Sequence, residues 1–119
     1  MKPFLLAMLG GVVYYIDKEG RLSSLREEGS VVEYETPLDA ADICAGIGGC
    51  GNYRIFIADR AEPSLKVFDP LNRRLVTLAS LPAVPLGIAK EECTIVVAVE
   101  GALLIFDLKR LEFVERRPL

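Results

Sequence analysis

The chain has 119 residues, a length that predicts a single domain spanning 1–119. Its 14 Lys and Arg against 17 Asp and Glu give a net charge of −3, which excludes a broadly basic surface for nucleic acid. It has no histidine, which excludes a cysteine nucleophile activated by histidine and a mixed Cys/His zinc site within one subunit. The apolar fraction of 51% is high for so small a domain and predicts some burial between subunits.

The first predicted element is a strand over residues 3–9, although Lys2 followed by apolar residues is also typical of a signal peptide. No small-residue cleavage site follows this segment. The apolar run from Phe4 to Ile16 is too short to span a bilayer and is interrupted by Gly10-Gly11. We therefore expect a cytoplasmic protein with neither a leader nor a membrane segment.

Short apolar runs separated by polar turns continue to the end of the chain, with no helical period. The further strands are predicted at residues 12–16, 21–25, 31–35, 42–45, 53–58, 65–68, 75–78, 85–89, 93–99, 102–106 and 111–116. They form three groups of four, at about 3–35, 36–80 and 81–117. A shift of 82 residues overlays Pro3–Ala7 on Pro85–Ala89 and Val12–Ile16 on Thr94–Ala98. Such a repeat predicts an all-β protein built from three similar units.

Two segments carry a resemblance to a known superfamily. Leu65–Asn72 resembles the strand-and-turn segment of a kelch repeat, and Leu104–Leu108 resembles YVTN-type or WD-type blades. The resemblance is to the β-propeller superfamily, and it implies that each group of four strands is one antiparallel blade. Propellers host enzymes, ligand binders and scaffolds alike, so the resemblance implies no particular function.

Propellers usually contain about 4–8 blades, so three blades predict a half-propeller that needs a partner. We expect a second copy to close a six-bladed ring as a homodimer with twofold symmetry. A different protein that completes the ring, or a barrel or sandwich of twelve strands, are the alternatives. The leading functional hypothesis is a non-enzymatic protein-interaction or scaffold module. The alternative is a ring-dependent hydrolase that binds a metal or small ligand through channel carboxylates.

Ligands of propellers usually lie at one mouth of the central channel. In this chain the loops expected at that mouth, between second and third strands and between blades, carry many charged residues. The candidates are Asp17, Arg21, Asp39, Asp59, Arg60, Glu62 and Glu100, with Lys18, Glu19, Glu35 and Asp42 beside them. In a dimer their carboxylates would suit a hard cation or general acid–base chemistry. For any one of these residues, however, the preferred interpretation is that it serves turn geometry and solubility. No catalytic residue, metal site or cofactor is predicted.

The run Gly46–Gly51 leads into a strand and is interpreted as a flexible hairpin loop, because a phosphate-binding loop leads into a helix. The three cysteines are expected to be small buried side chains, with a Cys44–Cys50 disulfide as a possibility. The chain contains no Gln and only Asn52 and Asn72, which resembles thermophile usage. Intracellular disulfides persist mainly in hyperthermophiles.

Overall fold

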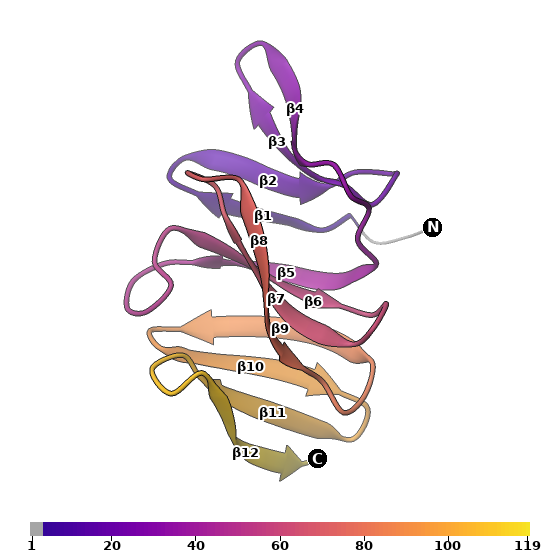
Figure 1. Cartoon of the computed structure of the whole chain (residues 1–119), viewed down its shortest axis with the longest axis vertical. Coiled ribbons are helices and arrows are strands. Elements are labelled where there is room, and N and C mark those ends of the chain that lie inside the picture. Colours follow the sequence, from indigo (N-terminus) through magenta and orange to yellow (C-terminus); the bar gives the residue numbers. More distant parts are fainter. Residues whose placement is uncertain (1–3) are drawn as a thin grey trace.

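The computed structural model describes residues 4–119 as twelve strands joined by turns (Figure 1). The strands are β1 (Leu6–Leu9), β2 (Val12–Ile16), β3 (Leu22–Arg26), β4 (Gly29–Tyr34), β5 (Ala40–Gly46), β6 (Arg54–Asp59), β7 (Ser64–Asp69), β8 (Arg74–Ser80), β9 (Pro85–Glu91), β10 (Thr94–Val99), β11 (Ala102–Asp107) and β12 (Glu112–Pro118). Each predicted strand has its counterpart. The first is shorter than the predicted 3–9, because β1 begins at Leu6, with Phe4 and Leu5 before it and Pro3 outside the described residues. Within residues 4–119 there is no helix long and apolar enough to cross a membrane.

The strands form three four-stranded antiparallel sheets in chain order, β1–β4, β5–β8 and β9–β12, which we call blades 1, 2 and 3. The first strands of the blades lie side by side, β1 against β5 and β5 against β9, so they form the inner edge of the arc. The predicted all-β class with three four-stranded blades is confirmed. Consecutive antiparallel strands need only short hairpin turns, which is why the turn residues marked the strand boundaries so clearly.

The pairing register confirms the 82-residue overlay of blade 1 on blade 3. Leu6 pairs with Tyr15 and Met8 with Val13 in blade 1. The residues 82 positions later pair in the same way, Ile88 with Val97 and Lys90 with Ile95. Blades 1 and 3 are therefore equivalent residue by residue over their first two strands.

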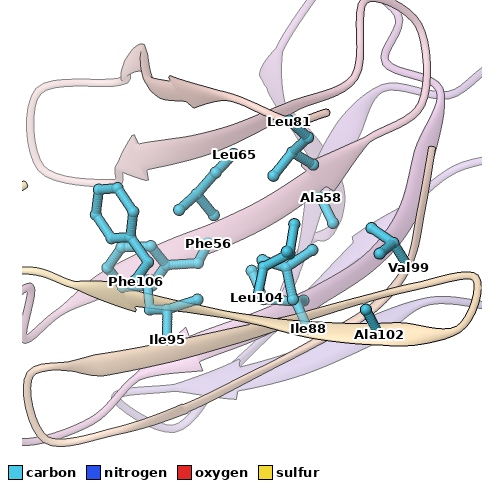
Figure 2. Close-up of a cluster of buried hydrophobic side chains, with 11 residues drawn as sticks. Phe56, Ala58, Leu65, Leu81, Ile88, Ile95, Val99, Ala102, Leu104 and Phe106 are labelled. Carbon is cyan, nitrogen blue, oxygen red and sulfur yellow. The ribbon is translucent and has the colours of Figure 1, made fainter. Parts of the chain in front are cut away.

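Each blade buries apolar side chains on a face that packs against its neighbour, because alternate residues of a strand point to opposite faces. Between blades 1 and 2 the packed side chains include Leu9, Tyr14, Leu22, Ile57 and Phe68. A second cluster lies between blades 2 and 3, where side chains from both ribbons point toward one another (Figure 2). Its members are Phe56, Ala58, Leu65, Leu81, Ile88, Ile95, Val97, Val99, Ala102, Leu104 and Phe106. Blade 2 therefore has a packed core on both of its faces.

Polar contacts also join the blades, at the inner strands and at the outer turns. The Asp42 carboxylate on β5 accepts a hydrogen bond from the Ile88 amide on β9 at 2.9 Å. The buried Glu33 carboxylate of blade 1 lies 3.6 Å from Arg26 and 3.8 Å from Arg73, which belongs to blade 2. Asp42, expected near the channel loops, therefore links two blades.

The disulfide differs from the bridge considered between Cys44 and Cys50. Cys50, in the β5–β6 loop of blade 2, is bonded to Cys93, in the β9–β10 turn of blade 3. Cys44 is a free thiol on β5 and packs beside the cluster between blades 2 and 3. A Cys44–Cys50 bridge is wrong because Cys44 belongs to a paired strand, whereas Cys50 lies in the loop that reaches the next blade.

The β5–β6 loop is also held by contacts with blade 3. Besides the disulfide, the Lys90 ammonium of β9 donates to the Gly48 carbonyl at 2.9 Å. A Cβ added at Gly49 would lie 2.7 Å from the Glu92 backbone, so glycine permits this close approach of two blades. The expected flexible loop is therefore an attachment between blades 2 and 3.

We predict that the Cys50→Ser/Cys93→Ser double variant loses about 2–4 kcal/mol of unfolding free energy, because the bridge closes a long loop in the unfolded chain. The sequence separation of the two cysteines is 43 residues. Urea unfolding followed by circular dichroism measures the change. Cys44→Ala is the control that removes a sulfur without removing the bridge. An unchanged midpoint in the double variant would contradict the prediction.

The reactivity of Cys44 gives a second test. Burial raises the pKa of the Cys44 thiol to about 12, with Asp42 adding to the rise and Lys90 opposing it. Because the thiolate is the reactive form, Cys44 should react with Ellman's reagent at pH 8 far more slowly in folded than in denatured protein. One thiol per chain should be counted after denaturation without reductant. A count of three would show that Cys50 and Cys93 are not bonded.

Candidate functional site

The predicted mouth is the end of the arc at which the β2–β3, β6–β7 and β10–β11 turns and the linkers between blades lie. Most of the candidate residues are in these segments. Asp17 and Arg21 flank the β2–β3 turn, Arg60 and Glu62 are in the β6–β7 turn, and Glu100 is in the β10–β11 turn. The strands position these residues because each hairpin turn of a repeat emerges at the same edge of its sheet.

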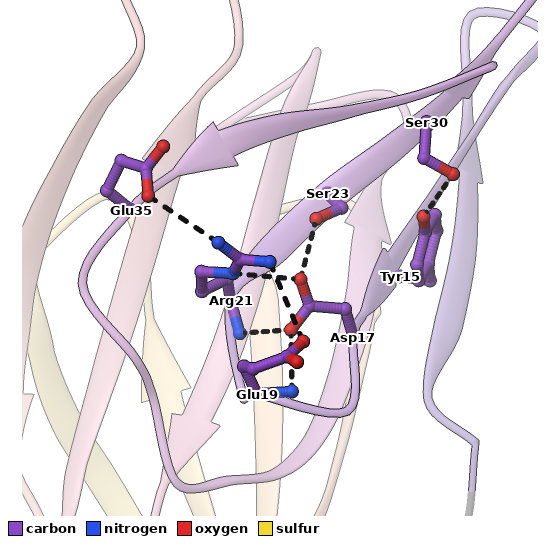
Figure 3. A network of polar contacts seen from close by, with 7 residues as sticks. All are labelled: Tyr15, Asp17, Glu19, Arg21, Ser23, Ser30 and Glu35. Atoms are coloured by element: carbon purple, nitrogen blue, oxygen red, sulfur yellow. Dashed lines mark hydrogen bonds and ion pairs between the residues drawn. The ribbon is translucent and has the colours of Figure 1, made fainter.

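Asp17 organises the β2–β3 turn (Figure 3). Its Oδ1 accepts hydrogen bonds from the amides of Glu19 and Arg21, both at 2.9 Å. Its Oδ2 accepts from Arg21 Nε at 3.1 Å and from the Ser23 hydroxyl at 3.3 Å. The Arg21 guanidinium also lies 3.8 Å from Glu35. Both oxygens of Asp17 are thus engaged by its own turn.

These contacts set the charge state of Asp17. Burial, the largest single influence, acts to raise its pKa. The backbone amide and side chain of Arg21, together with the amide of Glu19, outweigh burial and hold the pKa below its usual value. Asp17 is therefore ionised at neutral pH, with Arg21 as its counter-ion.

Asp39 and Arg60 form the second charged pair of the mouth. Arg60 Nη2 and Nε both donate to Asp39 Oδ1, at 2.8 and 3.2 Å. The Arg60 amide also donates to the Asp39 carbonyl at 2.9 Å. The linker between blades 1 and 2 is thereby joined to the β6–β7 turn. Both side chains are about four-tenths exposed, so the pair faces solvent at the mouth.

Asp59 ends β6 at the same edge of the sheet, but its side chain does not face solvent. It is buried, and its carboxylate lies 3.0 Å from the Lys66 ammonium on the neighbouring strand β7. Its Oδ1 accepts a hydrogen bond from the Ala61 amide at 3.1 Å. Glu62 and Glu100 are exposed. The candidate carboxylates thus lie in three turns, a linker and a strand end, and Asp17, Asp39 and Asp59 are each paired with a basic side chain.

Four aspartates make the same local contact, an acceptor bond from the amide two residues later. The donors are Glu19 for Asp17, Ala61 for Asp59, Leu71 for Asp69 and Lys109 for Asp107. This is the Asx-turn, which supports the interpretation that turn aspartates serve geometry. Within residues 4–119 no three Cys, Asp or Glu side chains lie together as a metal site would need.

A pocket of about 380 Å³ opens at the mouth between blades 1 and 2. Its apolar walls are Phe4, Leu5, Ile16, Leu38, Ala40 and Ala41. Asp17, Lys18 and Arg60 lie among the lining residues, so two of the predicted site residues, Asp17 and Arg60, meet here. The apolar walls were not predicted as part of a site, because Leu38, Ala40 and Ala41 precede the predicted strand at 42–45 and were interpreted as linker between blades. Only the packing of β1 against β5 shows that they face one space.

Comparison with known proteins supports the fold. No family model matches the chain, and no curated protein does. Among solved structures, KlHsv2 with its loop 6CD replaced by a Gly-Ser linker superposes with a TM-score of 0.68 at 14% identity, over 98% of this chain and 38% of that one. The N-terminal domain of Nup159, a β-propeller, superposes with a TM-score of 0.65 at 12% identity, over 97% of this chain and 33% of that one. The fold is propeller-like.

A protein in a nidogen/laminin complex is also similar, with a TM-score of 0.56 and 10% identity over 96% of this chain and 62% of that one. This chain therefore spans less than two thirds of each of these three structures. The comparisons do not distinguish kelch-type from YVTN-type or WD-type blades, so the blade type stays a prediction. At such low identities the likeness extends to the fold alone.

The pairing of Asp17 with its turn predicts a pH-dependent effect of Asp17→Asn. Asparagine keeps one oxygen acceptor for the turn amides but loses the charge opposite Arg21, at a cost of about 1 kcal/mol at pH 7. The folded-state pKa is lowered, so the carboxylate stabilises the fold above the unfolded pKa near 3.9, and this contribution is lost as pH falls through the folded value.

Urea unfolding of the wild type and of Asp17→Asn at pH 7, 5 and 3 measures the difference in unfolding free energy between them. The stability difference should be equal at pH 7 and 5 and smaller at pH 3. Glu62→Gln, at an exposed position of the next turn, is the matched control and should show no comparable difference. A difference that is constant down to pH 3 would contradict the assignment.

Proposed function

We propose that this chain is a non-enzymatic protein-interaction module, a half-propeller that assembles with a second copy into a six-bladed ring. The single observation that carries the proposal is the contrast between equivalent positions of the repeat. Ile88 of blade 3 is 9% exposed because blade 2 covers it, whereas its blade 1 counterpart, Leu6, is 54% exposed. The same face of a blade is thus a packed core in one repeat and open in the other.

The open side of blade 1, which we call the leading face, is apolar. Pairing places Leu6 beside Tyr15 and Met8 beside Val13, and Val13 beside Leu25 of the third strand. Leu6, Met8 and Leu25 are each more than half exposed. The Phe4 ring stacks on Tyr15 with ring centres 5.7 Å apart. A contiguous apolar surface of this kind marks an interaction site.

We call the open side of blade 3 the trailing face. The corresponding faces of blades 1 and 2 each pack against the next blade along the chain. Val96 pairs with Ala89 and with Ile105, and Ala98 pairs with Leu103. In the repeat these positions match the face of blade 2 that carries Phe56 and Ala58, which are buried against blade 3. A trailing face is therefore shaped by the repeat to receive a leading face.

In the proposed ring the trailing face of each copy covers the leading face of the other, which makes two equivalent contacts about a twofold axis. The ring brings the charged turns of both copies around one axis, where Glu62 and Glu100 are exposed for further contacts. A different protein that supplies the missing blades is the competing partner. We place this assembly in the cytoplasm. The thermophile-like composition fits a Cys50–Cys93 bridge there, since intracellular disulfides persist mainly in hyperthermophiles.

The assembly predicts a solution mass of twice 13.1 kDa, that is 26.2 kDa, at micromolar concentration. Light scattering coupled to gel filtration measures the mass. Leu6→Glu and Val96→Glu should each reduce it to that of the monomer, because each places a charge in both contacts of the ring. Leu71→Glu is the control, since Leu71 lies in the β7–β8 turn of blade 2 and is 75% exposed.

Mixing the two monomeric variants distinguishes this arrangement from others. The Leu6→Glu copy retains its trailing face and the Val96→Glu copy its leading face, so the mixture should recover one intact contact and form a heterodimer. Circular dichroism should show that each variant remains folded. A wild-type monomer at tens of micromolar, or variants that fail to complement, would overturn the head-to-tail ring. Larger open assemblies would show that the contact forms without closing.

A further inference from the structure

The pocket between blades 1 and 2 has the size and walls of a small-molecule site. Its volume of about 380 Å³ falls within the range of about 300–1,000 Å³ that is usual for ligand pockets. Its walls come from the segment before β1, the end of β2 and the start of β5, with Leu5, Ile16 and Ala40 among them. These elements belong to one chain, so the pocket exists whether or not a second copy binds.

The two arginine–carboxylate pairs near the pocket leave little negative charge available to a ligand. Among its lining residues, Asp17 has both oxygens engaged by Arg21, Ser23 and turn amides. Glu19 and Glu35 are not lining residues, and they lie 3.6 and 3.8 Å from Arg21. A ligand that required a free carboxylate of the protein, such as a metal cation or an amine, therefore has no vacant partner in this lining.

The basic groups of the lining are less fully used. Arg60 binds Asp39 through Nε and Nη2, and no hydrogen bond joins its Nη1 to a described residue. Lys18 is exposed and forms no ion pair with any of residues 4–119. Lys18 and Arg60, both lining residues of this apolar cavity, thus each keep a donor group that no described residue uses. Two such donors suit a single carboxylate and are too few for a polyphosphate.

We infer that this pocket binds a small organic monocarboxylate with an aromatic or branched aliphatic body. The body fills the space between Leu5, Ile16 and Leu38, and the carboxylate meets the ammonium of Lys18 and the unused edge of Arg60. Binding removes the apolar walls from water, which supplies most of the affinity. The charged contact at the exposed rim selects the acid over its neutral analogue.

The test uses 2-naphthoate and its neutral analogue 2-naphthamide as probes, added to the ¹⁵N-labelled full chain and followed by NMR. Naphthoate should shift the amides of Gly20, Leu38, Ala40 and Ala41 saturably and bind about three-fold more tightly than naphthamide. Lys18→Gln should reduce the affinity for naphthoate about three-fold and leave naphthamide unchanged. Lys109→Gln, at an exposed lysine in the β11–β12 turn, is the matched control and should change neither.

A second variant tests the cavity itself. Ala41→Phe should fill the pocket and reduce the affinity for both probes at least ten-fold, with a native-like spectrum elsewhere. Raising NaCl from 20 to 500 mM should remove the preference for naphthoate, since the rim contact is screened. Equal binding of both probes, or a Lys18→Gln variant that behaves as Lys109→Gln, would overturn the inference. Shifts that map to Leu6 or Val96 on the open faces would also overturn it, as would the absence of shifts at millimolar probe concentration. None of these results bears on the ring, which the solution mass tests separately.

Discussion

The packing of one apolar sheet face against the next is the interaction on which the rest of this structure depends. A four-stranded sheet with apolar side chains on both faces cannot be stable alone in water, because each face must be covered. Blade 2 satisfies this condition, with Phe68 and Ile57 packed toward blade 1 and Phe56 and Leu65 toward blade 3. Blades 1 and 3 satisfy it on one side only.

The fold could be predicted from the sequence because local signals agree with the global arrangement. Turn residues divide the strands, and the 82-residue overlay of Pro3–Ala7 on Pro85–Ala89 identified the N-terminal segment as a strand. The register of Leu6 with Tyr15 and of Ile88 with Val97 confirms that overlay. The disulfide could not be predicted in the same way, since it depends on how far the β5–β6 loop extends toward the next blade.

In the candidate site, too, the sequence predicts what depends on neighbouring residues and misses what depends on contacts between distant segments. The sequence placed Asp17 and Arg60 in mouth loops, and the structure brings both to one pocket. Turn geometry, the role that the sequence favours for turn aspartates, is the one that Asp17 has in its own turn. The sequence did not show that Asp59 would face Lys66 inside blade 2. Aspartate followed by a tight turn was the available signal, and it favours an Asx-turn over a free carboxylate. The apolar walls required the packing of β1 on β5.

The two contacts between blades are built differently, and this bears on both proposals. The Cys50–Cys93 disulfide ties blade 2 to blade 3, whereas within the described residues no disulfide ties blade 1 to blade 2. Blade 1 is therefore held on blade 2 by the chain between them, by packing and by polar contacts. The pocket lies in that same contact, with the Asp39–Arg60 pair at its rim. In the proposed ring, a ligand in this pocket would therefore lie in the contact that positions blade 1, and with it the leading face, on the rest of the chain.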